Sequence, residues 1–150
     1  MLLISACLAG ENCRMDGSNN LVPALRALVE AGRAVVACPE VLGGLPTPRL
    51  ASERLAGGAV VNCAGEDVSE AFALGAERAY QIFCQHGCSA AVLKARSPSC
   101  GKGCIYDGSF THTRTEGNGV FAELLLSKGV PVLTEEEYPE AAAEERSVPA

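Results

Sequence analysis

The sequence predicts a single α/β domain: a three-layer, Rossmann-like fold around a mostly parallel sheet of about four or five strands. Short apolar runs alternate with amphipathic helical patterns along the chain, which is typical of a parallel sheet covered by helices. The 150 residues, of which 48% are hydrophobic, suit one domain with its own buried core. We find no internal repeat, so we expect the domain over residues 1–135 and an acidic, disordered tail over residues 136–150.

The first half of the chain predicts two buried strands joined by a helix. The elements are, in order, a strand over 2–6, a helix over 19–31, a strand over 34–37, a loop over 39–55 and a short strand over 59–62. Asn19 or Asn20 can cap the helix, Pro23 is tolerated in its first turn, and Gly32 ends it. The loop is rich in proline and glycine, and a long loop in a compact domain is usually functional.

The second half continues the same alternation. Its elements are a helix that starts at Asp67 and ends at Gly87, a strand over 90–93, a glycine-rich loop over 97–119, a helix over 120–127 and a strand over 130–133. Asp67 with Glu70 three residues later predicts a capping box at the start of the first helix. Its apolar residues form one stripe, which comprises Val68, Phe72, Ala76, Ala79 and Phe83.

The distribution of charge excludes several classes of partner. Twelve basic and 18 acidic residues give a net charge of −6, and six of the glutamates lie from Glu135 onward, so we expect a solvated end to the chain. Without that segment the chain is nearly neutral, and it has no basic patch and no tryptophan, which argues against a polynucleotide partner but leaves a single base or nucleoside open. We find neither a signal peptide nor a membrane span and expect a cytoplasmic protein, as monomer or dimer.

Eight cysteines are more than a cytoplasmic domain needs, because disulfides rarely persist there. Cys7 and Cys38 directly follow predicted strands, and Cys100 lies in the loop after the third strand. Ligands of parallel sheets bind at the carboxyl ends of the strands, so these three thiols are expected to converge. No C-x-x-C pair is present. Packing is the favoured role for the other five cysteines, which are Cys13, Cys63, Cys84, Cys88 and Cys104. Cys13 and Cys104 are the first candidates for another role, because both lie in predicted loops.

Three chemistries remain open for Cys7, Cys38 and Cys100. Three thiolates with one open coordination position suit a [4Fe–4S] cluster whose fourth iron meets a substrate. They also suit a zinc ion that keeps one water. Alternatively, small cysteines simply fill a core.

Four polar side chains near these cysteines are candidate catalytic residues, each with a structural alternative. Glu40, in Cys-Pro-Glu, can act as a general acid and base beside the thiolates, or it can cap a helix or pair with Arg49. Asp16 can serve as a second carboxylate, or form an ordinary Asp-Gly turn. Ser97 and Ser99 can orient a substrate or a water molecule, or bond only to the backbone of their own loop.

Five segments, in this order along the chain, resemble the bacterial thiouracil desulfidase family. They are ISACL over 4–8, RMDG over 14–17, CPEVLGGLPTPR over 38–49, SPSCG over 97–101 and IYDGSF over 105–110. The resemblance covers roughly residues 1–135. Met15 stands where the family commonly has tyrosine, which points to a different pocket wall or substrate preference.

The resemblance implies an enzyme with an oxygen-sensitive [4Fe–4S] cluster held by Cys7, Cys38 and Cys100. Such an enzyme converts thiolated uracil bases or nucleosides (2-thiouracil, 4-thiouracil, 4-thiouridine) to the oxo form and releases hydrosulfide without net redox change. Glu40 would be the acid and base, assisted by a serine of the 97–99 stretch. An aerobic preparation could lack the cluster or hold zinc instead. A non-catalytic iron–sulfur or zinc sensor on the same cysteines is the alternative function.

Overall fold

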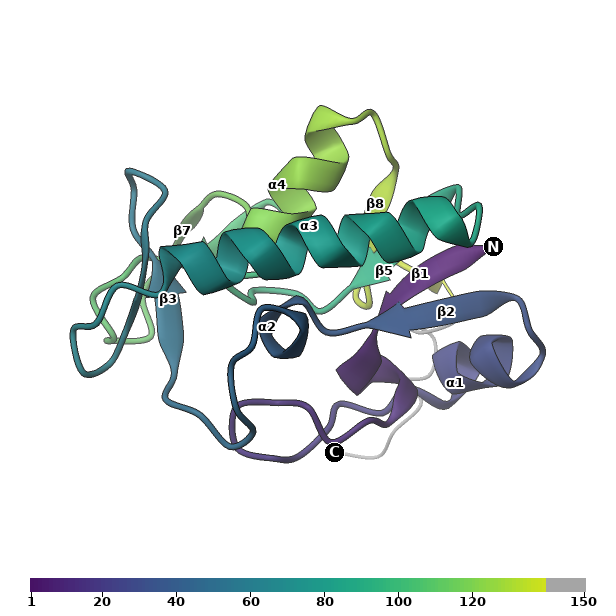
Figure 1. Cartoon of the computed structure of the whole chain (residues 1–150), viewed down its shortest axis with the longest axis horizontal. Coiled ribbons are helices and arrows are strands. Elements are labelled where there is room, and N and C mark those ends of the chain that lie inside the picture. The colour runs from purple at the N-terminus through teal and green to yellow at the C-terminus, as the bar shows by residue number, and fades with distance from the viewer. Residues whose placement is uncertain (140–150) are drawn as a thin grey trace.

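The structure, a computed structural model, describes residues 1–139. Its centre is a four-stranded sheet in which all strands are parallel, in the order β2-β1-β5-β8 (Figure 1). The strands are β1 (Leu2–Ser5), β2 (Ala34–Ala37), β5 (Ala90–Leu93) and β8 (Val132–Thr134). The predicted α/β class and parallel sheet are confirmed, although β8 begins two residues later than expected.

Helices cover both faces of the sheet and complete the three layers. α3 (Ser69–Gln85) and α4 (Val120–Ser127) pack on one face, and α1 (Pro23–Glu30) packs on the other (Figure 1). Successive side chains of a strand point to opposite faces, so Leu3 joins the cluster under α3 and α4 while Ile4 joins the cluster under α1. None of the helices within residues 1–139 has the length and apolar character of a membrane span.

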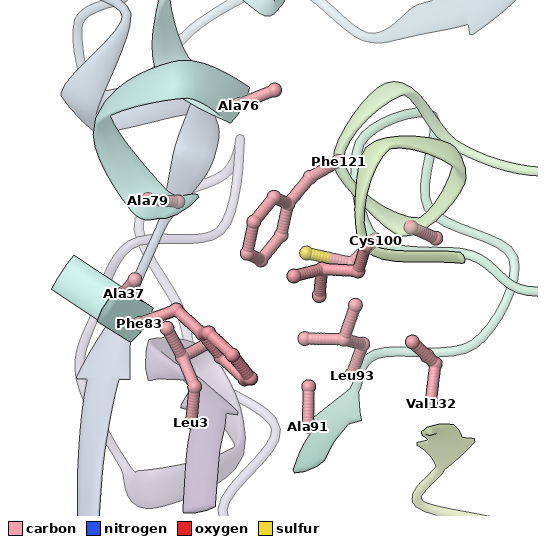
Figure 2. Packing of buried hydrophobic residues seen from close by; sticks show 12 residues of the cluster. Leu3, Ala37, Ala76, Ala79, Phe83, Ala91, Leu93, Cys100, Phe121 and Val132 are labelled. Carbon is pink, nitrogen blue, oxygen red and sulfur yellow. The ribbon is translucent and has the colours of Figure 1, made fainter. Parts of the chain in front are cut away.

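The larger hydrophobic cluster lies between the sheet and helices α3 and α4 (Figure 2). Phe121 of α4 is fully buried in it, and Phe83 of α3 is nearly so. Burial of each aromatic ring stabilises the fold by roughly 1.5–3 kcal/mol. The sulfur of Cys100 lies beside the Phe121 ring (Figure 2), so the packing that holds α4 against the sheet also holds one of the candidate site residues.

The two asparagines predicted to cap α1 do not cap it. The helix begins at Pro23, whose fixed φ and missing N–H suit the first helical position, and Val22 precedes it without a side-chain cap. Asn19 instead accepts a hydrogen bond from the backbone N–H of Leu21 at 3.0 Å. Asn20 points to Cys7, so its role belongs to the site described below.

The start of α3 also differs in detail from the prediction. The helix begins at Ser69, and the Asp67 carboxylate accepts the Ser69 backbone N–H at 2.8 Å. Hydrogen bonds from the side chain of Ser69, and then from its backbone, hold the pKa of Asp67 below its usual value. The structure describes no return hydrogen bond from Glu70, so the second half of the predicted capping box is missing. The apolar stripe is buried at Phe72, Ala76, Ala79 and Phe83 and half-buried at Val68.

Both segments predicted as loops contain short elements. The first holds helix α2 (Pro39–Leu42) and strand β3 (Ser52–Arg54), which pairs with β4 (Val60–Asn62). The second holds the antiparallel pair β6 (Cys104–Tyr106) and β7 (Arg114–Glu116). A further turn of 3-10 helix, η1 (Ala6–Ala9), follows β1 directly. α2, β3, β6 and β7 lack the run of four apolar residues that marks a strand such as β5, so the hydrophobic pattern did not indicate them.

Helix α2 lies backbone against backbone on α3, and two glycines make this contact possible. A Cβ added to Gly75 of α3 would overlap the carbonyl of Pro39, and one added to Gly43 would overlap the carbonyl of Ala71. No other residue type fits this approach without a shift of the helices. The contact fixes the short helix that carries Glu40 and that follows Cys38.

The segment after β8 packs against the loop that follows β5. Glu135 is only 3% exposed, so the expectation of a solvated chain from Glu135 onward is wrong at this residue. Its carboxylate accepts the backbone N–H of Ala95 at 2.7 Å and pairs with Lys94 at 2.8 Å. The next glutamate, Glu136, is exposed and pairs with Arg96 at 2.8 Å. The predicted tail over 136–150 lies mostly outside the described residues.

Candidate functional site

A cavity of about 470 Å³ opens at the carboxyl ends of β1, β2 and β5. β1 lies between β2 and β5, so the chain continues to opposite sides of β1, and such a switch point is where α/β sheets bind ligands. Cys7, Cys38 and Cys100 all line this cavity. The three thiols therefore line one cavity at the strand ends, as the strand pattern predicted.

Cys7 lies in η1, immediately after β1, and is 9% exposed. The amide of Asn20 donates a hydrogen bond to its sulfur at 3.5 Å, and the carbonyl oxygen of Asn20 accepts one from Arg14 at 3.2 Å. The pKa of the Cys7 thiol is lowered, first by a hydrogen bond from Cys13 and then by Asn20. This environment stabilises the thiolate, which is the form that binds a metal.

Cys13 is a fourth thiol in the cavity, and it is one of the two cysteines for which a role other than packing was considered. Its side chain hydrogen-bonds with the sulfurs of both Cys38 and Cys7, and these contacts raise the pKa of Cys13. Its carbonyl accepts a hydrogen bond from Arg49 at 2.9 Å. Its position in a predicted loop was the sequence signal, which Cys104 shared although Cys104 lies in β6 and outside the cavity lining.

Cys38 precedes α2 and is half-buried. Its pKa is lowered to about 7, chiefly by the hydrogen bond from Cys13 and also by the backbone N–H of Val41. Cys100 differs because it is only 4% exposed and burial raises its pKa, while the Ser5 side chain hydrogen-bonds to it and acts in the opposite direction. The three strand-end thiols thus lie in unequal environments.

Glu40 combines the catalytic and structural alternatives expected for it. Its side chain lines the cavity and is 15% exposed, and its Oε1 accepts a hydrogen bond from Arg49 Nε at 3.1 Å. Arg49 is anchored in turn by Thr47, Pro46 and the carbonyl of Cys13. Pairing with Arg49 therefore does not remove Glu40 from the cavity but fixes its orientation there.

The second carboxylate oxygen of Glu40 accepts a hydrogen bond from the hydroxyl of Ser99 at 2.9 Å. The hydroxyls of Ser99 and Ser97 are also 2.9 Å apart. A hydroxyl has a single proton, so when Ser99 donates to Glu40, Ser97 donates to Ser99. The Ser97 oxygen also accepts the backbone N–H groups of Ser99 and Cys100 at 3.1 and 3.0 Å, which shapes the turn that carries Cys100.

The structure does not bring Asp16 into the cavity lining. Its exposed carboxylate accepts hydrogen bonds from the backbone N–H and the hydroxyl of Ser18, and these bonds lower the pKa of Asp16. This is the ordinary Asp-Gly turn of the structural alternative. Its neighbour Met15 does line the cavity and is 40% exposed.

Several lining residues were missed by the sequence reasoning. Lys94 directly follows β5, so the strand-end argument used for the cysteines would also have selected it. Tyr106 and His112 reach the cavity from the β6–β7 pair, with their rings edge to face and 6.2 Å apart between centroids. Tyr106 belongs to the IYDGSF segment of the family resemblance, but neither residue was given a role, because the β6–β7 pair itself was not predicted.

The remaining cysteines lie outside the cavity lining. Cys63 and Cys84 are exposed, so the expectation that they pack in the core is wrong. Cys88 is half-buried and packs against the larger cluster, as expected. Cys104 is half-buried in β6.

The donor set of the cavity fits an iron–sulfur cluster. Cys7, Cys38 and Cys100 offer soft thiolate ligands, which iron–sulfur clusters and zinc both accept. Within residues 1–139, no group of three or more histidine, cysteine, aspartate or glutamate side chains is arranged to hold a single metal ion. In a cluster each thiolate binds a different iron, so the sulfurs need not converge on one point. The cavity also has the volume of an ordinary small-molecule site.

Comparison with known proteins agrees with this arrangement. A family model described as 2-thiouracil desulfurase matches residues 2–137. The chain is 40% identical to the Bacillus subtilis (strain 168) protein YbbK, described as uncharacterized, with 91% of this chain and 97% of YbbK covered. It also resembles the solved structure of the [4Fe-4S]-dependent thiouracil desulfidase TudS, with a TM-score of 0.87, 42% identity and 98% of both chains covered.

The family match extends over both layers of helices and every side chain of the cavity described above. The similarity to YbbK and to TudS covers nearly the full length of each protein, so it is a relationship of whole domains rather than of one motif. The chain therefore belongs to the 2-thiouracil desulfurase family.

Proposed function

We propose that this protein is a desulfidase that converts thiolated uracil bases or nucleosides, such as 2-thiouracil, 4-thiouracil and 4-thiouridine, to their oxo forms and releases hydrosulfide. The observation that carries the proposal is one cavity in which three strand-end thiols lie beside a carboxylate held by Arg49 and Ser99. The similarity to the [4Fe-4S]-dependent thiouracil desulfidase TudS supports the same reaction class.

Cys7, Cys38 and Cys100 would hold the cluster, one iron each, and leave the fourth iron without a protein ligand. When bound, the cluster supplies a Lewis acid that attracts a soft thiocarbonyl sulfur and polarises the adjacent carbon. The hydrogen bonds from Asn20 and Ser5 to two of the thiols would keep these ligands oriented, as the surroundings of metal ligands do in general.

Glu40 would move the proton. Its carboxylate takes a proton from a water molecule as the water oxygen forms a bond to the thiocarbonyl carbon. The carbon–sulfur bond then breaks, and the proton passes to the sulfur, which leaves as hydrosulfide, while the remaining proton of the water goes to solvent. The carbon keeps its oxidation state, so the reaction needs neither an oxidant nor a reductant.

Ser99 and Ser97 would orient this carboxylate. Ser99 donates to Oε2 of Glu40 and Arg49 donates to Oε1, so each oxygen of the carboxylate is held by its own donor. Positioning of this kind lowers the barrier because the base already lies in its reactive geometry. Ser97 donates to the Ser99 hydroxyl and so supports the hydrogen bond from Ser99 to Glu40. It also shapes the turn before Cys100.

Anaerobic reconstitution with iron and sulfide, followed by a sulfide assay, tests the proposal. We expect sulfide release from at least one of 2-thiouracil, 4-thiouracil and 4-thiouridine, with stoichiometric formation of the oxo product and loss of activity in air. A parallel sample loaded with zinc is the control. Protein that binds iron and sulfide but releases no sulfide from any of these compounds would contradict the proposal and favour the non-catalytic alternative.

A further inference from the structure

Lys94 occupies a constrained place at the edge of the cavity. It directly follows β5, lines the cavity and has a side chain that is 25% exposed. Its backbone N–H donates to the hydroxyl of Ser5 at 2.9 Å, which ties it to the end of β1. Because β1 and β5 flank the switch point of the sheet, this lysine lies where ligands of such folds bind.

Glu135 fixes the ammonium group of Lys94. One carboxylate oxygen accepts the backbone N–H of Ala95 at 2.7 Å, and the other pairs with Lys94 Nζ at 2.8 Å. The Glu135 side chain is only 4% exposed, so this pair is largely shielded from solvent. The Glu135 carboxylate thus holds both the backbone of Ala95 and the side chain of Lys94, which restricts the rotamers of a side chain that is normally flexible.

The ammonium group retains capacity for a ligand. It has three N–H groups. The structure describes partners for two of them within residues 1–139, namely Glu135 and the carbonyl of Ala95 at 3.3 Å. A rigid cation with a free donor at a ligand cavity is suited to bind an oxygen acceptor.

Other donors of the cavity are committed elsewhere. Arg49 binds Glu40, Thr47 and two carbonyls, and Ser99 donates to Glu40. Asn20 donates to Cys7. His112, on the β6–β7 pair, is exposed to solvent. Arg14 and Arg96 also line the cavity, but Arg14 donates to Asn20 and Arg96 pairs with the exposed Glu136. Lys94 differs from them because its partner carboxylate, Glu135, is buried and because one of its N–H groups has no partner among the described residues.

We propose that Lys94 binds the carbonyl oxygen that a thiouracil retains beside its thiocarbonyl group, and that Glu135 positions it to do so. This inference rests on the proposed function, since it assigns the second polar contact of the same substrate. A thiouracil ring carries one sulfur and one oxygen outside the ring, and the oxygen can only accept hydrogen bonds. Lys94 is thus a specificity-determining residue that favours rings with this oxygen over rings without it.

The test compares product analogues that differ by one oxygen. Calorimetry on the cluster-loaded protein measures dissociation constants for uracil, 2-pyrimidinone and 4-pyrimidinone. A hydrogen bond to a charged donor corresponds to about tenfold or more in affinity, so one of the pyrimidinones should bind at least about tenfold more weakly than uracil. In Lys94→Met, the ratio of the dissociation constant of that pyrimidinone to the dissociation constant of uracil should fall to about one.

A matched pair of double variants guards against misfolding. Lys94→Met with Glu135→Gln removes both charges and keeps an amide oxygen for the Ala95 N–H. Lys102→Met with Glu137→Gln removes the neighbouring ion pair, whose lysine is outside the cavity lining, and keeps an acceptor for the Thr134 N–H. The control should keep the wild-type preference for uracil, and the Lys94 pair should lose it.

Each remaining outcome is decisive. A Lys94 variant that prefers uracil as strongly as the wild type overturns the inference, and so does a Lys94 double variant that loses iron while the control retains it. Sulfide release by the wild type separates the two proposals. If the wild type releases sulfide but Lys94 does not affect the preference, only the inference fails; if it neither releases sulfide nor binds uracil, both fail.

Discussion

The hydroxyl of Ser99 donates a 2.9 Å hydrogen bond to Oε2 of Glu40, although the two residues are 59 positions apart in the chain. Glu40 follows the end of β2 and Ser99 follows the end of β5, so the two loops meet across the intervening strand β1. This bond joins the two loops of the candidate site that carry Cys38 and Cys100.

Glu40→Gln tests the proton-transfer role. The amide keeps the shape of the side chain and can still accept from Ser99, but it cannot take a proton from water. We expect iron content close to that of the wild type and sulfide release reduced by about 100-fold or more, which is the usual contribution of a general acid or base. Measurement of iron and of sulfide on the same sample checks this, and an active variant would remove Glu40 from the mechanism.

Ser99→Ala should mainly reduce turnover, whereas Ser97→Ala should also reduce iron content. Ser99 orients the Glu40 carboxylate, so its loss should reduce turnover by about tenfold while iron is retained. Ser97 accepts two backbone N–H groups of the turn before Cys100, so its loss should reduce iron content as well. Iron per chain, measured beside the sulfide assay, separates the two effects. Equal iron loss in both variants would contradict the division of roles.

Cys13 provides the control for the three proposed ligands. Replacement of Cys7, Cys38 or Cys100 by alanine should abolish the cluster absorbance, because each would bind its own iron. Cys13→Ala should retain iron, although this thiol lines the same cavity and hydrogen-bonds to two of the others. Anaerobic reconstitution of the four variants, followed by iron and sulfide analysis, is the measurement. Loss of the cluster in Cys13→Ala alone would show that the ligand assignment is wrong.

Gly75→Ala should destabilise the protein, although Gly75 does not line the cavity. The new methyl group would overlap the Pro39 carbonyl and push α2 away from α3. Overpacking of this kind costs about 1–3 kcal/mol of unfolding free energy. Gly57→Ala is the control, since an added Cβ meets nothing within 4 Å there. Denaturant unfolding of both variants checks the difference, and a fully stable Gly75→Ala would mean that the helices can separate freely.

The strands and their ends could be predicted because their signals are local. Runs such as 90–93 are apolar and bounded by polar residues, and the rule for parallel sheets then places Cys7, Cys38 and Cys100 at one edge without any knowledge of the distances. The same rule applied to Lys94 would have placed it there too. Lys94 was not among the expected site residues because a single lysine after a strand carries no metal or catalytic pattern.

Other parts of the site depend on contacts that no local pattern reveals. Asn20 precedes a helix and resembles a cap, but Pro23 begins the helix later and frees the amide for Cys7. Glu135 belongs to a run of glutamates, which favours a solvated segment, yet its carboxylate is buried against Ala95. In both cases a partner distant in sequence decides the role of the side chain, and composition does not indicate that partner.

The position of Glu135 also sets an order of events during synthesis. All three proposed ligands have been synthesised once Cys100 is added to the chain, but the loop that carries Cys100 is held by a carboxylate 35 residues further along the chain. β8, which pairs with β5, arrives equally late. Domains fold as units once their chain is complete. The cavity can therefore take its final shape only after nearly the whole domain has been translated, and delivery of iron and sulfide should follow translation rather than accompany it.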